Sequence, residues 1–161
     1  MTTTRIERDC LGTMEIPDDR YYGIQTCRMV KVSGCAHLPV IFYPGMHRAL
    51  FCIKKACALA NAEIGALKPE IARAIVEACD RALAGEFDKE FPLDMWQGGG
   101  YTCVNMNVNE VIGNAANEIL TGRKGQEAVH PNTHVNKAQS TNDTIPSSTS
   151  RRFLLSTSGR L

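Results

Sequence analysis

The chain of 161 residues suits one domain, and its 18 lysines and arginines nearly balance its 17 acidic residues. That balance argues against a nucleic-acid partner, which calls for a basic stripe, and against an acidic solvating tail. The charged N-terminus lacks the apolar core of a signal peptide, and two lysines split the richest apolar run, residues 49–60. We therefore expect a cytoplasmic protein with no membrane span.

The seven cysteines are irregularly spaced, with no Cys-x-x-Cys pair and no cysteine–histidine cluster at zinc spacing. Their odd number and the absence of a secretory signal favour reduced thiols. Cys57 and Cys79 fall on apolar helical stripes, where cysteine acts as a small hydrophobic residue. No metal and no organic cofactor is predicted.

Two segments precede the first clear helix. Residues 1–24 predict an irregular or short-stranded entry with a turn at Pro17-Asp18-Asp19, and glycines and prolines leave residues 27–46 without a predicted element. From His47, apolar residues recur every three or four positions, which predicts an amphipathic helix that stops at Lys68-Pro69. Its predicted apolar stripe is Leu50, Ile53, Cys57, Ala60, Ile64 and Leu67.

A second helix is predicted to start at Pro69, which suits a first helical turn, and to end just before Gly85. We expect the two helices to pack as an antiparallel pair and assign them no chemistry beyond core packing. The apolar face of the second helix would be Ile71, Ile75, Ala78 and Ala82. The following loop is predicted to be anchored by Phe91, Pro92 and Trp96.

Three glycines, residues 98–100, precede a third predicted helix that Thr102 would cap and Gly122 would end. Glycines let backbone N–H groups approach a ligand, and a helix N-terminus favours anions. Three glycines alone, however, are more often a flexible turn. This helix carries five asparagines, which are poor helix formers, so tertiary contacts are predicted to hold it.

The segment His130–Asp143, HPNTHVNKAQSTND, is almost entirely polar. It cannot pack in a core without leaving donors and acceptors unpaired, so it is either a solvated loop or the lining of a site. Composition alone favours a loop. The hydroxyls of Ser140 and Thr141 and the carboxamide of Asn142 can nevertheless all donate to a carboxylate, which favours a site.

Taken together, these segments resemble the N-terminal part of the aspartate ammonia-lyases, in the aspartase/fumarase superfamily. The six ordered motifs are RIERDCLG (Arg5–Gly12), EIPDDRYYGIQT (Glu15–Thr26), IKKACALAN (Ile53–Asn61), FPLDMWQGGG (Phe91–Gly100), VNMNVNEVIGN (Val104–Asn114) and HPNTHVNKAQSTND. The entry Tyr21-Tyr22-Gly23 and the run Ser140–Asp143 are closer to aspartase than to fumarase, which remains the alternative.

The resemblance implies a mainly α-helical fold: the N-terminal helical domain of the aspartase/fumarase fold, truncated before the central helical bundle. Residues 1–146 would form this domain. Residues 147–161 would be a divergent or truncated tail at the start of the central helix region, because their sequence departs from the family's helix pattern. The family's bundle drives tetramer formation, so a homotetramer is implied for a full-length protein.

The implied reaction is reversible deamination of L-aspartate to fumarate and ammonia through an enediolate-like intermediate. The implied substrate-binding residues are Thr102, Ser140, Thr141, Asn142, Gly99 and Gly100. His130 and Asn132 are candidates for a secondary anion site, although a structural role for His130 is equally expected.

Two departures from the family bear on function. Where the family has Gly-Gly-Ala-Gly-Thr-Ser, Tyr101 replaces a glycine and Cys103 replaces a serine on either side of Thr102, and the bulk of Tyr101 could block the carboxylate pocket. No residues match the mobile GSSxMPxKxN loop whose serine is the family's catalytic base. We therefore expect little or no activity from this chain alone, and a non-catalytic remnant or interaction domain remains an alternative.

Overall fold

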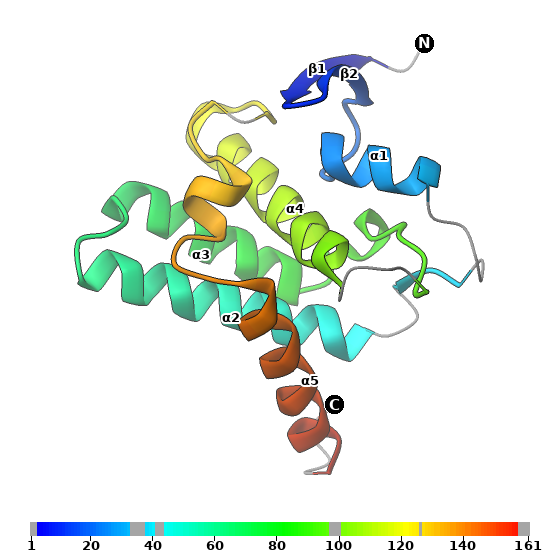
Figure 1. Cartoon of the computed structure of the whole chain (residues 1–161). Helices are drawn as coiled ribbons and strands as arrows, with labels where there is room; N and C mark the ends of the chain where they lie inside the picture. Colours follow the sequence, from blue (N-terminus) through cyan, green and yellow to red (C-terminus); the bar gives the residue numbers. More distant parts are fainter. Residues whose placement is uncertain (1–2, 33–37, 41–43, 97–100, 126, 158–161) are drawn as a thin grey trace.

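The computed structural model describes residues 3–32, 38–40, 44–96, 101–125 and 127–157, and shows a small β-hairpin beside a group of helices (Figure 1). The elements are β1 (Thr4–Asp9), β2 (Gly12–Pro17), α1 (Ile24–Val32), α2 (Pro44–Glu63), α3 (Pro69–Leu83), the 3-10 turn η2 (Asp88–Glu90), α4 (Thr102–Thr121), the π-helical turn η3 (Pro131–Val135) and α5 (Thr141–Thr157). The mainly helical fold predicted from the sequence is confirmed.

The N-terminal hairpin confirms the short-stranded entry. β1 and β2 pair antiparallel along their full length, with Asp9 opposite Gly12 at the turn. The guanidinium of Arg5 reaches past the hairpin and donates to the carbonyl oxygens of Arg20 and Tyr22, each at 2.8 Å. These bonds hold the hairpin against the segment that leads into α1.

The core lies between α2, α3 and α4. α2 and α3 form the predicted antiparallel pair, and α4 packs against α3 (Figure 1). Pro69 opens α3, and Gly85, with a φ of 92°, lies in the turn just beyond its end. The buried side chains of α3 are Ala72, Ala74, Ile75, Ala78, Cys79 and Ala82.

The buried face of α2 differs from the predicted apolar stripe. Ile64 is 76% exposed, whereas Lys54 is 0% exposed, and the buried face passes through Leu50, Lys54, Ala58 and Asn61. The face is turned because α5 also packs against α2, and the polar segment before α5 places its amide oxygens on Lys54. The predicted apolar stripe is therefore wrong in part, because the buried face also carries a polar cluster centred on Lys54.

α4 is the central helix, buried on every side from Val104 to Asn117. Its asparagines are held by tertiary contacts, as predicted. The carboxamide of Asn117 donates to the carbonyl oxygen of Val129 at 2.7 Å and accepts from the N–H groups of Ala128 and Val129 at 2.9 Å. Gly122, with a φ of 73°, ends the helix as predicted.

The sequence predicts no regular element for most of the residues of α1. A carboxylate from α4 caps the N-terminus of this helix. Glu110 is 1% exposed and accepts hydrogen bonds from the N–H groups of Gly23, Gln25 and Thr26 at 2.8–3.1 Å, and from the Thr26 hydroxyl at 2.6 Å. Burial raises the pKa of Glu110, whereas these donors oppose the shift. The N-terminus of α1 is thus satisfied by a residue distant in sequence.

The approach of Glu110 requires a glycine at position 23. A Cβ atom there would lie 2.7 Å from Oε2 of Glu7 and 2.8 Å from Oε1 of Glu110. We expect Gly23→Ala to lower the free energy of unfolding by about 2 kcal/mol, measured by urea denaturation. Gly113→Ala is the control, because its Cβ would meet Pro131 at an ordinary 3.5 Å. An equal effect of both substitutions would contradict the close approach.

His47 is buried in the first turn of α2, on the ring of Phe91, with ring centroids 4.3 Å apart. Its Nε2 has no hydrogen-bond partner among the described residues. Burial lowers the pKa of His47 to about 4. The folded chain therefore keeps this imidazole neutral at a pH at which the unfolded chain protonates it.

Acid should accordingly weaken the fold through His47. The stabilisation is present above the unfolded pKa of about 6.5 and is lost as the pH falls towards 4. We expect His47→Leu to gain about 2 kcal/mol relative to the wild type between pH 7.5 and pH 5, measured by urea denaturation at each pH. The exposed neighbour provides a control, Arg48→Leu, which should show no such gain. A pH-independent difference for His47→Leu would rule out this role.

One other sequence prediction is wrong. Phe91 is buried as expected, but Trp96 is 70% exposed and does not anchor its loop. After residue 146 the chain remains helical, because α5 continues through Pro146 to Thr157. The domain boundary placed after residue 146 stays a prediction, although a continuous helix crosses it.

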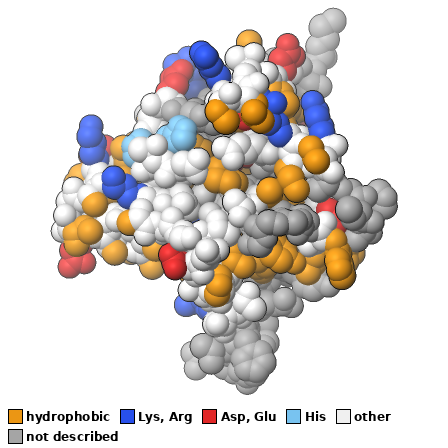
Figure 2. Space-filling model, in the orientation of Figure 1, with side chains coloured by type: hydrophobic (Ala, Val, Ile, Leu, Met, Phe, Trp, Pro, Cys, Tyr) orange, Lys and Arg blue, Asp and Glu red, His pale blue; other side chains and the backbone are white. Residues whose placement is uncertain are grey.

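No helix among the described residues is long and apolar enough to cross a membrane. On the face shown in Figure 2, hydrophobic side chains gather at the lower right, above the end of α5, while the remainder is mixed. Among the described residues, the large hydrophobic side chains that are exposed are Ile6, Leu11, Val30, Val32, Leu59, Ile64, Trp96 and Leu120.

Candidate functional site

The predicted substrate-binding residues lie at the N-termini of two helices. Thr102 is the first residue of α4, and Thr141 and Asn142 are the first two of α5. Asn105, one turn into α4, donates from Nδ2 to the Thr141 hydroxyl at 3.3 Å and so joins the two helix starts. Gly99 and Gly100 lie outside the described residues.

Ser140 stands at the N-cap position of α5. Its Oγ accepts from the N–H of Asn142 at 3.1 Å, and its own N–H donates to Asp143 Oδ2 at 3.2 Å. This reciprocal pairing is a capping box, which explains part of the polarity of the segment. The Ser140 hydroxyl hydrogen remains available, and the exposed carboxamide of Asn142 has no partner among the described residues.

Beneath these donors lies a buried amide cluster that the sequence analysis did not predict. The Lys54 ammonium donates to Asn105 Oδ1 at 2.8 Å, Asn136 Oδ1 at 2.9 Å and Gln139 Oε1 at 3.0 Å. Asn136 Oδ1 also accepts from Nδ2 of Asn105 and of Asn109, at 3.1 and 3.2 Å. The cluster fixes the segment before α5 to both α2 and α4.

Burial sets the ionisation of the lysine in this cluster. Desolvation lowers the pKa of Lys54 to about 7, and no carboxylate among the described residues pairs with it. The three amide oxygens favour its charged form, because an ammonium has three donors and no acceptor.

A mainly apolar pocket of about 340 Å³ lies beside Thr102, between α1, the hairpin and α4. Its charged groups, Arg28 and Asp9, form a bidentate pair at 2.7 and 2.8 Å, so the arginine is already satisfied. The lining residues are Asp9, Cys10, Leu11, Gln25, Arg28, Met29, Val32, Thr102, Cys103 and Met106.

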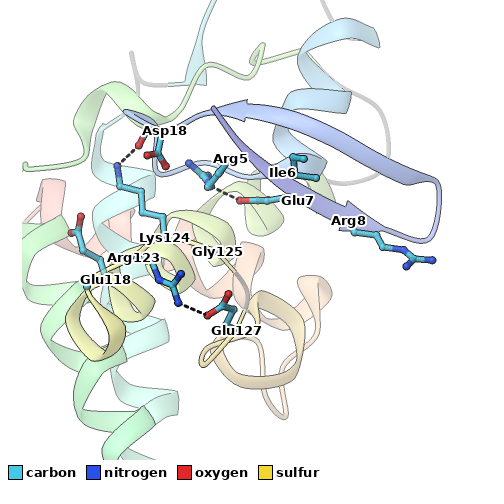
Figure 3. Close-up of a pocket in the computed structure, with 11 residues that line it drawn as sticks. Arg5, Ile6, Glu7, Arg8, Asp18, Glu118, Arg123, Lys124, Gly125 and Glu127 are labelled. Atoms are coloured by element: carbon cyan, nitrogen blue, oxygen red, sulfur yellow. Dashed lines mark hydrogen bonds and ion pairs between the residues drawn. The ribbon is translucent and has the colours of Figure 1, made fainter. Parts of the chain in front are cut away.

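A second cavity, about 640 Å³, lies away from these residues, between β1 and the loop after α4 (Figure 3). Both signs of charge line it, and most are paired: Arg123 with Glu127 at 3.4 Å, and Arg5 with Glu7 at 2.9 Å. Lys124 donates to the carbonyl oxygen of Asp18 at 2.7 Å. Because its cations are mostly satisfied, we do not assign the substrate to this cavity.

Tyr101 and Cys103, the two departures beside Thr102, both pack against the hydrophobic core. Tyr101 precedes α4 at the cap position with a φ of 63°, a left-handed conformation that favours glycine. Tyrosine there costs roughly 1 kcal/mol of backbone strain. Tyr101 is not among the residues that line the pocket beside Thr102, and it, rather than Thr102, occupies the capping position.

His130 and Asn132, the candidate secondary anion residues, lie at the start of η3. Nδ1 of His130 accepts from the N–H groups of Asn132 and Thr133 at 3.2 Å, so these N–H groups are already satisfied. The N–H of His130 in turn donates to His134 Nδ1 at 2.8 Å. Burial, followed by the charges of His130 and two lysines, lowers the pKa of His134. The anion site itself remains a prediction.

Within the described part of the chain, no group of three or more histidine, cysteine, aspartate or glutamate side chains is arranged to hold a metal ion. Six cysteines there, residues 10, 27, 52, 57, 79 and 103, are free thiols.

A family model described as lyase matches residues 12–158. The chain is 47% identical over 148 residues to a fumarate hydratase class II of Thermosynechococcus vestitus, covering 90% of this chain and 31% of that protein. It is 46% identical over 156 residues to an aspartate ammonia-lyase of Pseudomonas aeruginosa, covering 96% of this chain and 33% of that protein. The crystal structure of a fumarate lyase:delta crystallin from Brucella melitensis superimposes with a TM-score of 0.92 at 42% identity, over 97% of this chain and 36% of that one.

The chain therefore belongs to this lyase family, within the aspartase/fumarase superfamily. It spans about a third of the length of these relatives, which fits an N-terminal portion of the fold. Because relatives named for either reaction match almost equally well, the family alone leaves the substrate open.

Proposed function

We propose that these residues form the N-terminal part of a lyase that converts L-aspartate reversibly to fumarate and ammonia. The observation that carries this proposal is the Asn105–Thr141 hydrogen bond, because it joins the start of α4 to the donor-rich start of α5. The aspartase-like run Ser140–Asp143 favours aspartate over malate. By the same resemblance, a longer protein that includes the bundle would be a cytoplasmic homotetramer.

The reaction needs donors aimed at a developing negative charge. Removal of a proton next to the β-carboxylate creates an enediolate-like intermediate, and donors fixed beforehand stabilise it. The hydroxyls of Ser140 and Thr141 and the carboxamide of Asn142 supply such donors, and the N-terminus of α5 adds partial positive charge. Thr102, Gly99 and Gly100 would bind the other carboxylate. No step here calls for a metal or an organic cofactor.

These 161 residues contain no match to the family's base-bearing loop, so we expect no turnover from the chain alone. Fumarate formation from aspartate, followed by ultraviolet absorbance, tests this, with particle size determined on the same sample. Turnover would mean that another group serves as the base, and the proposed division of the site would be wrong.

Binding tests the site separately from turnover. We expect succinate, an unreactive dicarboxylate, to shift the backbone amide NMR signals of residues 140–142. Asn142→Ala should weaken binding about tenfold, because one hydrogen bond to a charged ligand is lost. The control is Ser147→Ala, at an exposed position of the same helix. Equal loss in both variants, or no binding by the wild type, would refute the site.

A fumarate hydratase is the second candidate, because relatives with that name are as similar as those named for aspartate. A competition experiment, in which aspartate or L-malate displaces bound succinate, distinguishes the two candidate functions. Stronger displacement by aspartate supports the proposal, and stronger displacement by malate supports the hydratase.

A further inference from the structure

Lys54 is a buried cation without a carboxylate partner among the described residues. It is 0% exposed near the middle of α2, whereas buried lysines are rare and are ordinarily paired with an opposite charge. The next residue, Lys55, pairs with Asp80 at 2.6 Å. Because burying a charge is costly, the contacts of Lys54 must explain why this lysine is buried.

All three N–H groups of Lys54 are used within the protein. They go to amide oxygens of Asn105, Asn136 and Gln139, at 2.8–3.0 Å. An ammonium has no further donor to offer. Lys54 therefore cannot also hold a substrate carboxylate in this arrangement, and any effect on a ligand must pass through its partners.

The ammonium fixes the direction of the hydrogen bonds in the chain that leads to Thr141. Because Lys54 can only donate, Asn105 must present its oxygen to it, and the same oxygen accepts from the Thr144 hydroxyl at 3.3 Å. The amide nitrogen of Asn105 must then face Thr141, 3.3 Å away. The Thr141 oxygen is thereby the acceptor, and its hydrogen is left to donate elsewhere.

We propose that Lys54 is a positioning residue that makes the Thr141 hydroxyl a donor to the bound carboxylate, by fixing the orientation of the Asn105 carboxamide. Without the ammonium, Asn105 can rotate by a half-turn, and Thr141 then donates to its oxygen. The Thr141 hydroxyl hydrogen would then no longer be available to donate to the ligand. The orientation of the Asn105 carboxamide does not depend on the proposed function, whereas the effect on a bound carboxylate rests on it.

The same arrangement makes ligand binding depend on pH. A neutral amine carries a lone pair and can accept from an amide N–H, so the orientation of Asn105 is fixed only while Lys54 is protonated. Burial lowers the pKa of Lys54 to about 7. The titratable groups that act on it are the thiols of Cys57 on α2 and Cys79 on α3, and burial raises the pKa of both, that of Cys79 to about 12. The side chains that face Lys54 from α4, from α5 and from the segment before α5 are amides and hydroxyls.

A double-mutant cycle on the full chain tests the inference, with succinate as the probe. Lys54→Met and Thr141→Val should each weaken binding about tenfold, and the double variant should bind no more weakly than either. Lys55→Met is the control and should bind as the wild type does. In the wild type, affinity should fall as the pH rises from about 6.5 to about 9, and in Lys54→Met it should stay constant.

Two results would overturn the inference: losses that multiply in the double variant, or a wild-type affinity that does not change with pH. The pH profile needs no substitution, so a variant that fails to fold leaves the test intact. If the wild type binds no succinate, the proposed function fails, and neutron crystallography still decides the orientation. A deuterium on Thr141 that points at Asn105 would refute it, and one that points away would support it.

Discussion

Glu110→Ala should lower the free energy of unfolding by on the order of 4 kcal/mol, or roughly 10 °C in melting temperature. The Glu110 carboxylate accepts four hydrogen bonds from Gly23, Gln25 and Thr26 at the start of α1. Alanine would leave these donors without an acceptor, mostly where water does not reach, and each such loss costs about 1–3 kcal/mol. Urea denaturation followed by circular dichroism measures the change.

Two variants on the same helix sharpen this test. Glu110→Gln keeps one carbonyl oxygen and should lose about half as much as alanine. Glu118→Ala removes a partly exposed carboxylate that bonds the Tyr21 hydroxyl at 2.8 Å, and should cost about 1 kcal/mol or less. If Glu110→Ala were no worse than Glu118→Ala, Glu110 would not be what holds α1.

Asn117→Ala should cost about 3 kcal/mol and loosen the chain between α4 and η3. The buried carboxamide donates to the carbonyl oxygens of Gly113, Gly125 and Val129, and accepts from the N–H groups of Ala128 and Val129. The alanine side chain has no donor or acceptor that could replace these hydrogen bonds. Amide hydrogen exchange should be faster at residues 128 and 129 in particular.

The exposed asparagine of η3 provides the matched control. Asn132→Ala removes the same carboxamide from a side chain with no hydrogen bond among the described residues, and should change stability by less than about 0.5 kcal/mol. Unchanged exchange at residues 128 and 129 in Asn117→Ala would show that other contacts hold this segment.

The sequence predicted the elements whose signals are local. α3 lies between Pro69 and Gly85, and α4 between Thr102 and Gly122, because apolar period and terminating residues sit within each helix. α1 was not predicted because Glu110, which caps its N-terminus, is 84 residues from Thr26. α5 escaped because its contacts with α2, rather than its own polar sequence, carry it through Pro146.

The candidate site shows the same difference between local and distant signals. The chemistry of Ser140, Thr141 and Asn142 pointed to possible carboxylate donors, whereas their assignment to a substrate site came from the family resemblance and stays a prediction. Lys54 was missed because a lysine within a helix ordinarily faces solvent. A signal did exist: Lys54 lies four residues from both Leu50 and Ala58, on the buried line of α2, whereas Lys55 does not.

The dependence of α1 on Glu110 has a consequence for how the chain folds during synthesis. The first 32 residues gain their buried acceptor only after residue 110 leaves the ribosome, on the order of ten seconds later at usual elongation rates. Until then α1, against which the hairpin packs, lacks the carboxylate at its N-terminus, and a two-stranded hairpin alone is marginal. The N-terminal segment should therefore stay protease-sensitive in nascent chains shorter than this and become protected in longer ones.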